Sequence, residues 1–409
     1  MTAATIEERT AVEAGSPLAA ALYELYSGAP VTVVAAPPGG GKSDLVARAV
    51  AHLFAHTDAT ITVATATNEQ GTAIAERIMA EIGAHEGPFA VRVASGKMRV
   101  PEGAGSPKDK AKVRAVQVRT AASCKASPPA TDFLIFDEAY QITFADFADG
   151  ADRAAQVLVV GDPGQIGPVV TVDTTAWAHL RQAPHMRAPD VLSQREDATI
   201  INMPATYRLG PVTAGVLHPL YGWEFESRRP QRALAQMPGE VRTLELPVRE
   251  TPFDLVSMTA VVDAALDYVG ATLRVQTSGG SRSRDLTPAD VAIVVSRRAQ
   301  ASAIEALLLE RAGGAEDITV GTADKLQGGQ WHAVVAVDPT LAGAESEHAL
   351  ASGRLCVMTS RHMTHLTWVY DDRWAAVLAG APDAEDAARG AAVREGLLAA
   401  GELRRVGAC

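Results

Sequence analysis

The sequence predicts an α/β protein made of two tandem domains, each built on a parallel β-sheet. The first reason is length, because the chain has 409 residues and single hydrophobic cores stop growing near ~250–300 residues. The second is a regular alternation of short β-rich apolar runs with Ala- and Leu-rich helical stretches. The third is that these runs are apolar on both faces, as buried parallel strands are, and that the pattern occurs twice.

The apolar runs give the positions of the expected strands. Those of the first domain lie at 31–36, 61–67, 133–138 and 157–162, and those of the second at 291–296, 318–323 and 333–338. We therefore expect a first domain over residues 1–200 and a second over 201–376. Residues 377–409 are Ala-rich and charged, which predicts a C-terminal helical tail, exposed and able to offer a surface to a protein partner.

The composition is typical of a soluble globular protein. Hydrophobic residues make up 47% of the chain and charged residues 21%, which argues against disorder. No apolar run reaches the ~20 residues that a membrane span needs. The first ten residues carry acids and no apolar core, so we expect no secretion signal and no membrane association.

The three cysteines, Cys124, Cys356 and Cys409, lie far apart along the chain. Their spacing matches neither a zinc motif nor a disulfide framework. The sequence therefore predicts a cytoplasmic protein without zinc.

The charge of the chain bears on its partners. The net charge is −11, whereas proteins that bind nucleic acid are more often basic. A local basic strip would still suffice to hold a strand in a narrow groove. Two Gly-rich segments with basic residues, 96–114 and 277–289, are predicted to be solvated surface loops, with contacts to phosphates as the alternative.

A phosphate-binding loop follows the first predicted strand. VTVVAA leads into PPGGGKS and then into a helical stretch, which is the P-loop pattern with Ala36 in place of the first Gly. Glycines let backbone N–H groups surround a phosphate, and the helix N-terminus adds the positive end of its dipole. We expect Lys42 to reach the β- and γ-phosphates and the Ser43 hydroxyl to bind Mg²⁺. The residues expected to bind the nucleotide here are Pro38, Gly39, Gly40, Gly41, Lys42 and Ser43.

Two further strands end in residues suited to hydrolysis. FLIF is followed by Asp137 and Glu138, which places both carboxylates at the carboxyl edge of the sheet, where α/β proteins bind ligands. We expect Asp137 to hold Mg²⁺ and Glu138 to polarise the attacking water as the catalytic base. VLVV ends in GDPGQ, whose Gln165 is expected to hydrogen-bond the γ-phosphate or that water.

The order of these motifs resembles a known family. DEAYQ followed by GDPGQIGPVV closely resembles motifs II and III of superfamily 1 helicases, nearest to the group of the nonsense-mediated-decay RNA helicase and its DNA-helicase relatives. Further stretches resemble other motifs in the family's order, namely ITVATATNEQ, VQVRTAAS, PATYRLG, VAIVVSRRAQ, ITVGTADKLQGGQ and GRLCVMTSRH. The resemblance covers about residues 31 to 370. It implies two RecA-like P-loop NTPase domains that use ATP and Mg²⁺.

The resemblance also implies roles for residues outside the P-loop. Arg208 and Arg361 match the family's arginine fingers, cations that reach the γ-phosphate from a second domain and stabilise the transition state. Tyr207 is expected to stack on the base, and Gly328 matches the glycine near the phosphates. The hydroxyls that match positions contacting the nucleic-acid backbone are Thr65, Thr67, Thr120 and Thr322.

The sequence also departs from the family pattern. No Gln precedes the P-loop, so the family's adenine-reading residue is absent and the choice of ATP over other nucleotides stays open. Gln330 stands where relatives usually have Glu, and Cys356 where they have Asn. Residues 71–131 leave little room for the accessory domain that relatives often insert there, which favours a minimal translocase over a processive unwinder.

Two functions of different kinds are consistent with the sequence. The first is an ATP-dependent helicase or translocase of superfamily 1, which hydrolyses ATP between two lobes to move along single-stranded DNA or RNA. The second is a P-loop ATPase switch that acts on a protein partner without unwinding strands, which the acidic net charge favours. A nucleotide-binding scaffold without turnover would require the roles expected of Glu138 and the two arginines to be wrong.

Overall fold

The computed structural model describes residues 11–405 apart from residues 84, 86, 110–112, 178, 278 and 312–314. Cys409 and parts of the segments 96–114 and 277–289 therefore lie outside the described residues. The chain divides into two units, one of residues 1–36, 41–163 and 167–203 and the other of residues 37–40, 164–166 and 204–409. Two short segments within the predicted nucleotide motifs thus group with the second unit.

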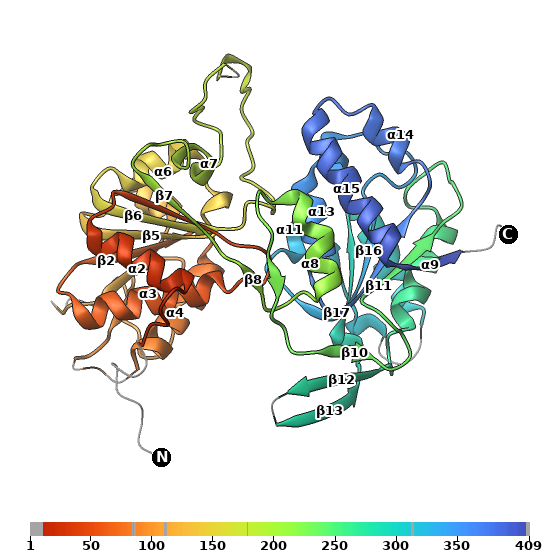
Figure 1. Ribbon diagram of the computed structural model, residues 1–409, viewed down its shortest axis with the longest axis horizontal. Helices are drawn as coiled ribbons and strands as arrows, with labels where there is room; N and C mark the ends of the chain where they lie inside the picture. The colour runs from red at the N-terminus through yellow and green to blue at the C-terminus, as the bar shows by residue number, and fades with distance from the viewer. Residues whose placement is uncertain are drawn as a thin grey trace. The chain divides into compact units, whose positions relative to one another are not determined.

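The first unit is built on a seven-stranded sheet (Figure 1). The strand order is β3-β4-β2-β5-β6-β1-β7, and all neighbouring strands run parallel. The strands are β1 (Val31–Ala35), β2 (Ile61–Thr65), β3 (Val91–Val93), β4 (Val116–Thr120), β5 (Thr131–Asp137), β6 (Ala154–Gly161) and β7 (Ala198–Asn202). The four runs predicted as strands in this region all form strands, which confirms the parallel α/β class.

Helices cover both faces of this sheet, which explains why its strands are apolar throughout. Val34 joins the core beneath α2, α3 and α4, whereas its neighbour Val33 joins the core beneath α5, α6 and α7, because successive strand residues point to opposite faces. The helices are α2 (Pro17–Ser27), α3 (Lys42–His56), α4 (Asn68–Ile82), α5 (Ala121–Ala126), α6 (Phe144–Ala151) and α7 (Ala188–Leu192).

The second unit repeats the plan with a six-stranded parallel sheet of order β15-β14-β16-β17-β11-β18. Its strands are β11 (Val241–Glu245), β14 (Val291–Val295), β15 (Thr319–Thr322), β16 (Trp331–Val337), β17 (His362–Tyr370) and β18 (Glu402–Arg405). The helices are α8 (Pro211–Leu217), α9 (Leu255–Leu266), α10 (Arg298–Leu309), α11 (Ala323–Leu326), α12 (Glu347–Leu350), α13 (Ser352–Thr359), α14 (Trp374–Ala379) and α15 (Ala384–Ala400). No helix in the described part of the chain is both long and apolar enough to cross a membrane.

The segment after residue 376, predicted to be an exposed tail, packs into the second unit over residues 384–405. Strand β18 extends the parallel sheet beside β11. On α15, Val393 and Leu397 enter the core that lies beneath α8 and α13, and Arg394 forms a buried ion pair with Asp338 at the end of β16, at 2.8 Å. The Ala-rich sequence has no apolar stripe that would predict this packing, because two apolar residues one turn apart and one paired cation suffice to anchor the helix.

A small antiparallel sheet is formed by β10 (Arg232–Leu234), β12 (Thr272–Thr277) and β13 (Gly280–Asp285). In Figure 1 the β12–β13 hairpin extends away from the six-stranded sheet. The segment 277–289 was expected to be a flexible loop, but residues 280–285 form a strand. All six residues of β13 are exposed, so the strand has none of the apolar alternation by which sequence patterns reveal strands. A further short parallel pair joins β8 (Ala205–Thr206) to β9 (Glu226–Ser227).

Candidate functional site

The loop after β1 delivers Lys42 and Ser43 to the carboxyl edge of the first sheet. β1 is buried along its whole length, and α3 begins at Lys42 with Gly41 as its N-cap. Gly41 has φ 87° and Gly39 has φ 71°, a left-handed backbone that residues with side chains rarely adopt. The glycines of the predicted P-loop are therefore required by the shape of the turn.

The Lys42 ammonium lies among acidic groups from two neighbouring strands. Its Nζ is 3.8 Å from Oε1 of Glu138, which follows β5, and 3.8 Å from Oδ2 of Asp162, which follows β6. The Lys42 and Asp162 side chains are 9% and 1% exposed. Buried charges of this kind need partners, so the lysine and the two carboxylates stabilise one another.

The Ser43 hydroxyl and the Asp137 carboxylate lie in direct contact. The Ser43 Oγ–H donates to Oδ2 of Asp137 at 2.9 Å, and the Glu138 N–H donates to Oδ1 at 3.0 Å. Burial and the nearby Glu138 charge raise the pKa of Asp137 to about 6, against the opposing effects of Ser43 and Lys42. Adjacent hydroxyl and carboxylate oxygens are hard ligands of the kind Mg²⁺ prefers. The pair therefore fits the predicted metal role.

Glu138 has an unusual backbone conformation. Its φ of 57° and ψ of 39° are left-handed, and among the described residues only Ala342 shares positive φ without being glycine. Such conformations cost of order 1–3 kcal/mol and are concentrated at functional sites. This backbone leaves the Glu138 side chain 22% exposed, while the preceding Asp137 is nearly fully buried. The Asp137 carboxylate is therefore buried and the Glu138 carboxylate partly exposed, and these different environments suit the different roles expected of them.

Asp162 is a site residue that the sequence did not single out. Its place resembles that of Asp137, because it follows the buried run VLVV at the end of β6, the strand next to β5. The available signal was the run of four apolar residues that ends at an acid, directly in the case of Asp137 and after Gly161 in the case of Asp162. Its proximity to Lys42 depends on strand order, which sequence patterns do not give.

The hydroxyls predicted to contact nucleic acid lie at strand ends. Thr65 and Thr120 are register partners at the carboxyl ends of β2 and β4, and Thr67 follows β2 as the N-cap of α4. Thr120 and Thr322 also accept a backbone N–H as N-caps, of α5 and α11. An N-cap oxygen that accepts an N–H keeps its own O–H as a donor. The capping roles are thus compatible with phosphate contacts, which stay a prediction.

The two predicted arginine fingers come together in the second unit. Arg208 donates from Nε to Oε1 of Gln330 at 3.1 Å and from an amino group to the Ser360 carbonyl at 3.3 Å. Arg361 follows Ser360, is 1% exposed, and donates to the Val357 carbonyl at 3.1 Å and the Ser360 hydroxyl at 2.9 Å. Arg361 is thus held firmly within its own unit, and its contact with a nucleotide stays a prediction.

The remaining predicted nucleotide-binding residues also lie in the second unit. The Thr206 hydroxyl donates to the Pro38 carbonyl at 2.6 Å, and the Tyr207 N–H donates to the Gly39 carbonyl at 2.8 Å. The Tyr207 ring is 53% exposed. Gly40 belongs to the same short segment, and Gly328 has φ 92°. Gln165 is nearly buried and accepts a hydrogen bond from the Gln327 amide at 3.3 Å.

Comparison with a family model supports the nucleotide motifs. Residues 19–171 match the model described as an AAA domain. The match includes the P-loop, Asp137 and Asp162, although it covers fewer than half of the 409 residues. No curated protein matches the sequence.

Several solved structures are similar to this chain at low identity. They include the PRRSV helicase, at 15% identity and a TM-score of 0.44, and the Arterivirus nonstructural protein 10 (helicase), at 14% and 0.48. The same Arterivirus protein in complex with DNA has 14% identity and a TM-score of 0.45. The alignments cover 85–86% of this chain, which spans 54–63% of the length of those chains.

Proposed function

We propose that this chain hydrolyses nucleoside triphosphates, with ATP and Mg²⁺ as the working pair, to move along single-stranded nucleic acid. The observation that carries the hydrolytic half is the meeting of Lys42, Ser43, Asp137 and Glu138 at one edge of the first sheet. The order of the sequence motifs, which resembles that of superfamily 1 helicases, carries the motor half. Neither observation distinguishes DNA from RNA as the bound strand.

Each residue of this edge has a distinct task in the proposal. Lys42 exchanges its contacts with Glu138 and Asp162 for the phosphates of the nucleotide, which leaves Glu138 available to accept a proton from the attacking water. Ser43 and Asp137 hold Mg²⁺, which when bound neutralises charge on the phosphates. The paired charges of the nucleotide-free site keep these groups in place before the nucleotide binds.

The second unit supplies the cations in this proposal. Arg208 and Arg361 share the Ser360 region, one through its carbonyl and the other through its hydroxyl, so a movement of this segment would move both. Positive charge near the γ-phosphate stabilises the transition state. A closure that depends on the nucleotide would then couple hydrolysis to movement along the strand.

The alternative function, a switch that acts on a protein partner, has one specific observation in its favour. The first unit exposes Val169 (83%), Val172 (60%) and Leu180 (42%) on the segment after Gln165. Exposed apolar side chains grouped along one segment are typical of surfaces that bind partners. Helix α15 uses its apolar residues within the second unit, so this alternative rests on the exposed segment after Gln165.

The deciding experiment measures hydrolysis of ATP and GTP with and without oligo-dT and poly-U. The motor predicts at least tenfold stimulation by one of the polynucleotides and a loss of about 10²–10⁴ in turnover for Glu138→Gln, the expected base. Glu305→Gln, the same change on the exposed face of α10, is the matched control. Hydrolysis without stimulation, together with no binding of either polynucleotide at low salt, would favour the switch.

A further inference from the structure

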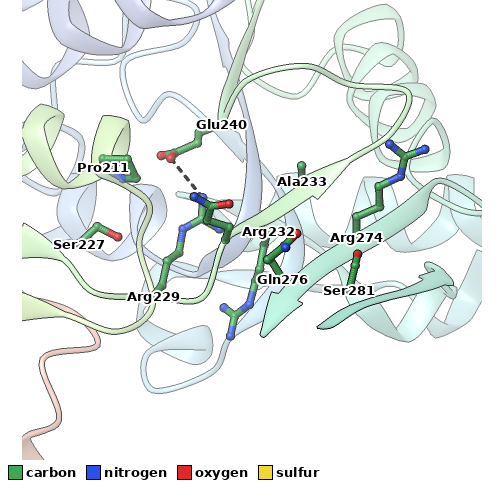
Figure 2. A pocket seen from close by; sticks show the side chains of 10 residues that line it. Pro211, Ser227, Arg229, Arg232, Ala233, Glu240, Arg274, Gln276 and Ser281 are labelled. Atoms are coloured by element: carbon green, nitrogen blue, oxygen red, sulfur yellow. Dashed lines mark hydrogen bonds and ion pairs between the residues drawn. The ribbon is translucent and has the colours of Figure 1, made fainter. Parts of the chain in front are cut away.

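A polar pocket of about 640 Å³ lies on the second unit, lined by residues to which no role was assigned above. Figure 2 shows its side chains. They come from the small β10-β12-β13 sheet, from the start of α8, from β9 and the segment between β9 and β10, and from the residue before β11. The lining residues are Pro211, Ser227, Arg229, Gln231, Arg232, Ala233, Glu240, Arg274, Gln276 and Ser281.

The pocket lies at the opposite edge of the parallel sheet from Thr322. Glu240 directly precedes β11, and Arg229 donates to the carbonyl of Met363 at the start of β17, at 2.7 Å. Both mark the amino ends of strands, whereas Thr322 stands at the carboxyl end of β15. Because all strands of this sheet are parallel, the pocket is separate from the nucleic-acid contact predicted at Thr322.

The register of the hairpin places its polar side chains on one face. Arg274 pairs with Ser283 and Gln276 with Ser281, so these four share a face, and three of them line the pocket. The other face carries Leu273, which is buried in the core, and Val275, which pairs with Arg282. One face of the hairpin thus anchors it to the unit and the other presents hydrogen-bond donors.

The pocket holds more positive charge than its own acid neutralises. Three arginines and one glutamate line it, and the glutamate, Glu240, is already bound to Arg229 at 3.1 Å. Arg229 is 5% exposed at its side chain, yet its Nε–H has no hydrogen-bond partner among the described residues, and neither has one amino group of Arg232. Burial and the nearby Arg229 charge lower the pKa of Arg232. An anion in the pocket would relieve both the crowding of charge and the unpaired donors.

The lining chemistry indicates which anion. Its donors are guanidinium, amide and hydroxyl groups, the side chains that contact phosphate oxygens in nucleic-acid complexes. None of the lining residues is aromatic, so the pocket offers no surface on which a base would stack. It suits phosphates presented without recognition of the base.

We propose that this pocket is a second binding site for the phosphodiester backbone of single-stranded nucleic acid, with the β12–β13 hairpin as one wall. This inference rests on the proposed motor function and adds a contact region to it. A strand held at both edges of the second sheet would be retained when the contacts at the carboxyl edge open, which favours continued movement over release.

The hairpin offers a matched pair of variants for the test. Arg274→Ala removes a cation from the pocket face, and Arg282→Ala removes the same charge from the opposite face of the same hairpin. Both residues are exposed, so neither change should alter folding, and equal melting temperatures would verify this. Affinity for fluorescent oligo-dT and oligo-U is measured by anisotropy over a series of salt concentrations.

We expect Arg274→Ala to weaken oligonucleotide binding about 3–10-fold and to reduce the slope of log K against log salt by about 0.7, the value for one lost phosphate contact on a single strand. Arg282→Ala should stay within about twofold of wild type, since its charge acts only at long range through screening solvent. The double variant Arg274→Ala/Gln276→Ala should lose more affinity than Arg274→Ala alone.

Equal effects of the two single variants would overturn the inference, because a diffuse charge effect does not distinguish the faces. It would also be overturned if inorganic tripolyphosphate bound the wild type but not Arg274→Ala while oligonucleotide affinity was the same in both. A wild-type protein that binds no oligonucleotide and shows no stimulated hydrolysis would instead contradict the proposed function itself, so the two failures are distinguishable.

Discussion

Asp137 illustrates the conflict between stability and function at a single residue. Its carboxylate is buried beside another acid, and its pKa is raised from 3.8 to about 6. A carboxyl whose pKa is higher in the folded protein than in the unfolded chain binds more protons when folded, so stability falls as the pH rises through the interval between the two values. At neutral pH the ionised Asp137 therefore destabilises the nucleotide-free protein, and Mg²⁺ would reverse this.

Asp137→Asn should accordingly stabilise the nucleotide-free protein while abolishing hydrolysis. One pKa unit corresponds to ~1.4 kcal/mol, so we expect a gain of about 1–3 kcal/mol at about pH 7.5 that shrinks towards about pH 4. Urea unfolding in EDTA at both pH values measures the difference. A variant less stable than wild type at neutral pH would show that the hydrogen bonds from Ser43 and Glu138 outweigh the burial of charge.

The site residues of the first unit were open to prediction for a local reason. Asp137 ends and Glu138 follows a strand that the apolar pattern reveals, while Lys42 and Ser43 follow another such strand through a glycine-rich loop. Their positions at a sheet edge therefore follow from the sequence. Asp162 stands in an equivalent place but was not assigned, since its link to Lys42 requires knowing that β6 lies between β5 and β1.

The last residue of β6, Gly161, lies against the turn that follows Glu138. A Cβ added to Gly161 would lie 2.6 Å from Cδ2 of Tyr140, 3.1 Å from the Tyr140 nitrogen and 3.2 Å from the Ala139 nitrogen. The last two are backbone atoms of the turn that follows Glu138, so the strand and this turn are in close contact. The glycine therefore sets the distance between the two acidic strand ends.

Gly161→Ala should push this turn away from β6, at a cost of about 1–3 kcal/mol from overpacking, and reduce hydrolysis by displacing Glu138. Gly150→Ala is the matched control, because its Cβ would meet nothing closer than 3.4 Å. Gly150 also lies in α6, where Ala is favoured over Gly by ~0.5–1 kcal/mol. Melting temperature and turnover are measured for both. Unchanged turnover in Gly161→Ala would mean that the turn tolerates the shift.

Helix α15 is held in the second unit by a buried ion pair as well as by its apolar residues. Arg394→Ala would leave Asp338, which is 1% exposed, buried without its partner, which typically costs about 3–5 kcal/mol. Arg389→Ala on the same helix removes an exposed pair with Glu385 and should change stability by no more than about 0.5 kcal/mol.

Tryptophan fluorescence during urea unfolding tests this pair of variants, since four of the five tryptophans, Trp223, Trp331, Trp368 and Trp374, lie in the second unit. Similar free energies of unfolding for the two variants would mean that α15 contributes little to the unit. A large loss confined to Arg394→Ala would establish that the end of the chain is part of the fold.

The proposed chemistry is divided between the two units, and turnover is therefore expected to need both. Arg361→Lys keeps the charge but loses the planar, multidentate guanidinium. We expect hydrolysis to fall about 10³-fold or more, as for the loss of an arginine finger, while nucleotide affinity stays near that of wild type because Lys42 and Ser43 are untouched.

Arg298→Lys is the control, because it makes the same substitution at an exposed position at the start of α10. Nucleotide affinity and single-turnover hydrolysis are measured for both variants, with melting temperatures to exclude unfolding. If Arg361→Lys hydrolyses ATP at the wild-type rate, Arg361 is a structural residue, held by Val357 and Ser360 for the sake of the fold alone.

By itself the sequence determined the parallel α/β class and the positions of the P-loop and of the acids after β5. These follow from local patterns, because an apolar run and the polar residues that end it are neighbours in the chain. The motif order also resembled a family of helicases, and the AAA domain match over residues 19–171 agrees with that resemblance for the first part of the chain.

Only the tertiary structure decided which distant residues meet. It brought Asp162 to Lys42, packed α15 and β18 into the second unit, and showed that residues 280–285, expected to lie in a loop, form a strand beside an arginine-lined pocket. In each case the deciding contact joins residues far apart in sequence. Exposed, Ala-rich and polar segments lack the periodic apolar pattern by which a sequence reveals buried elements. The strand order and the packing of the helices were therefore needed to identify these contacts.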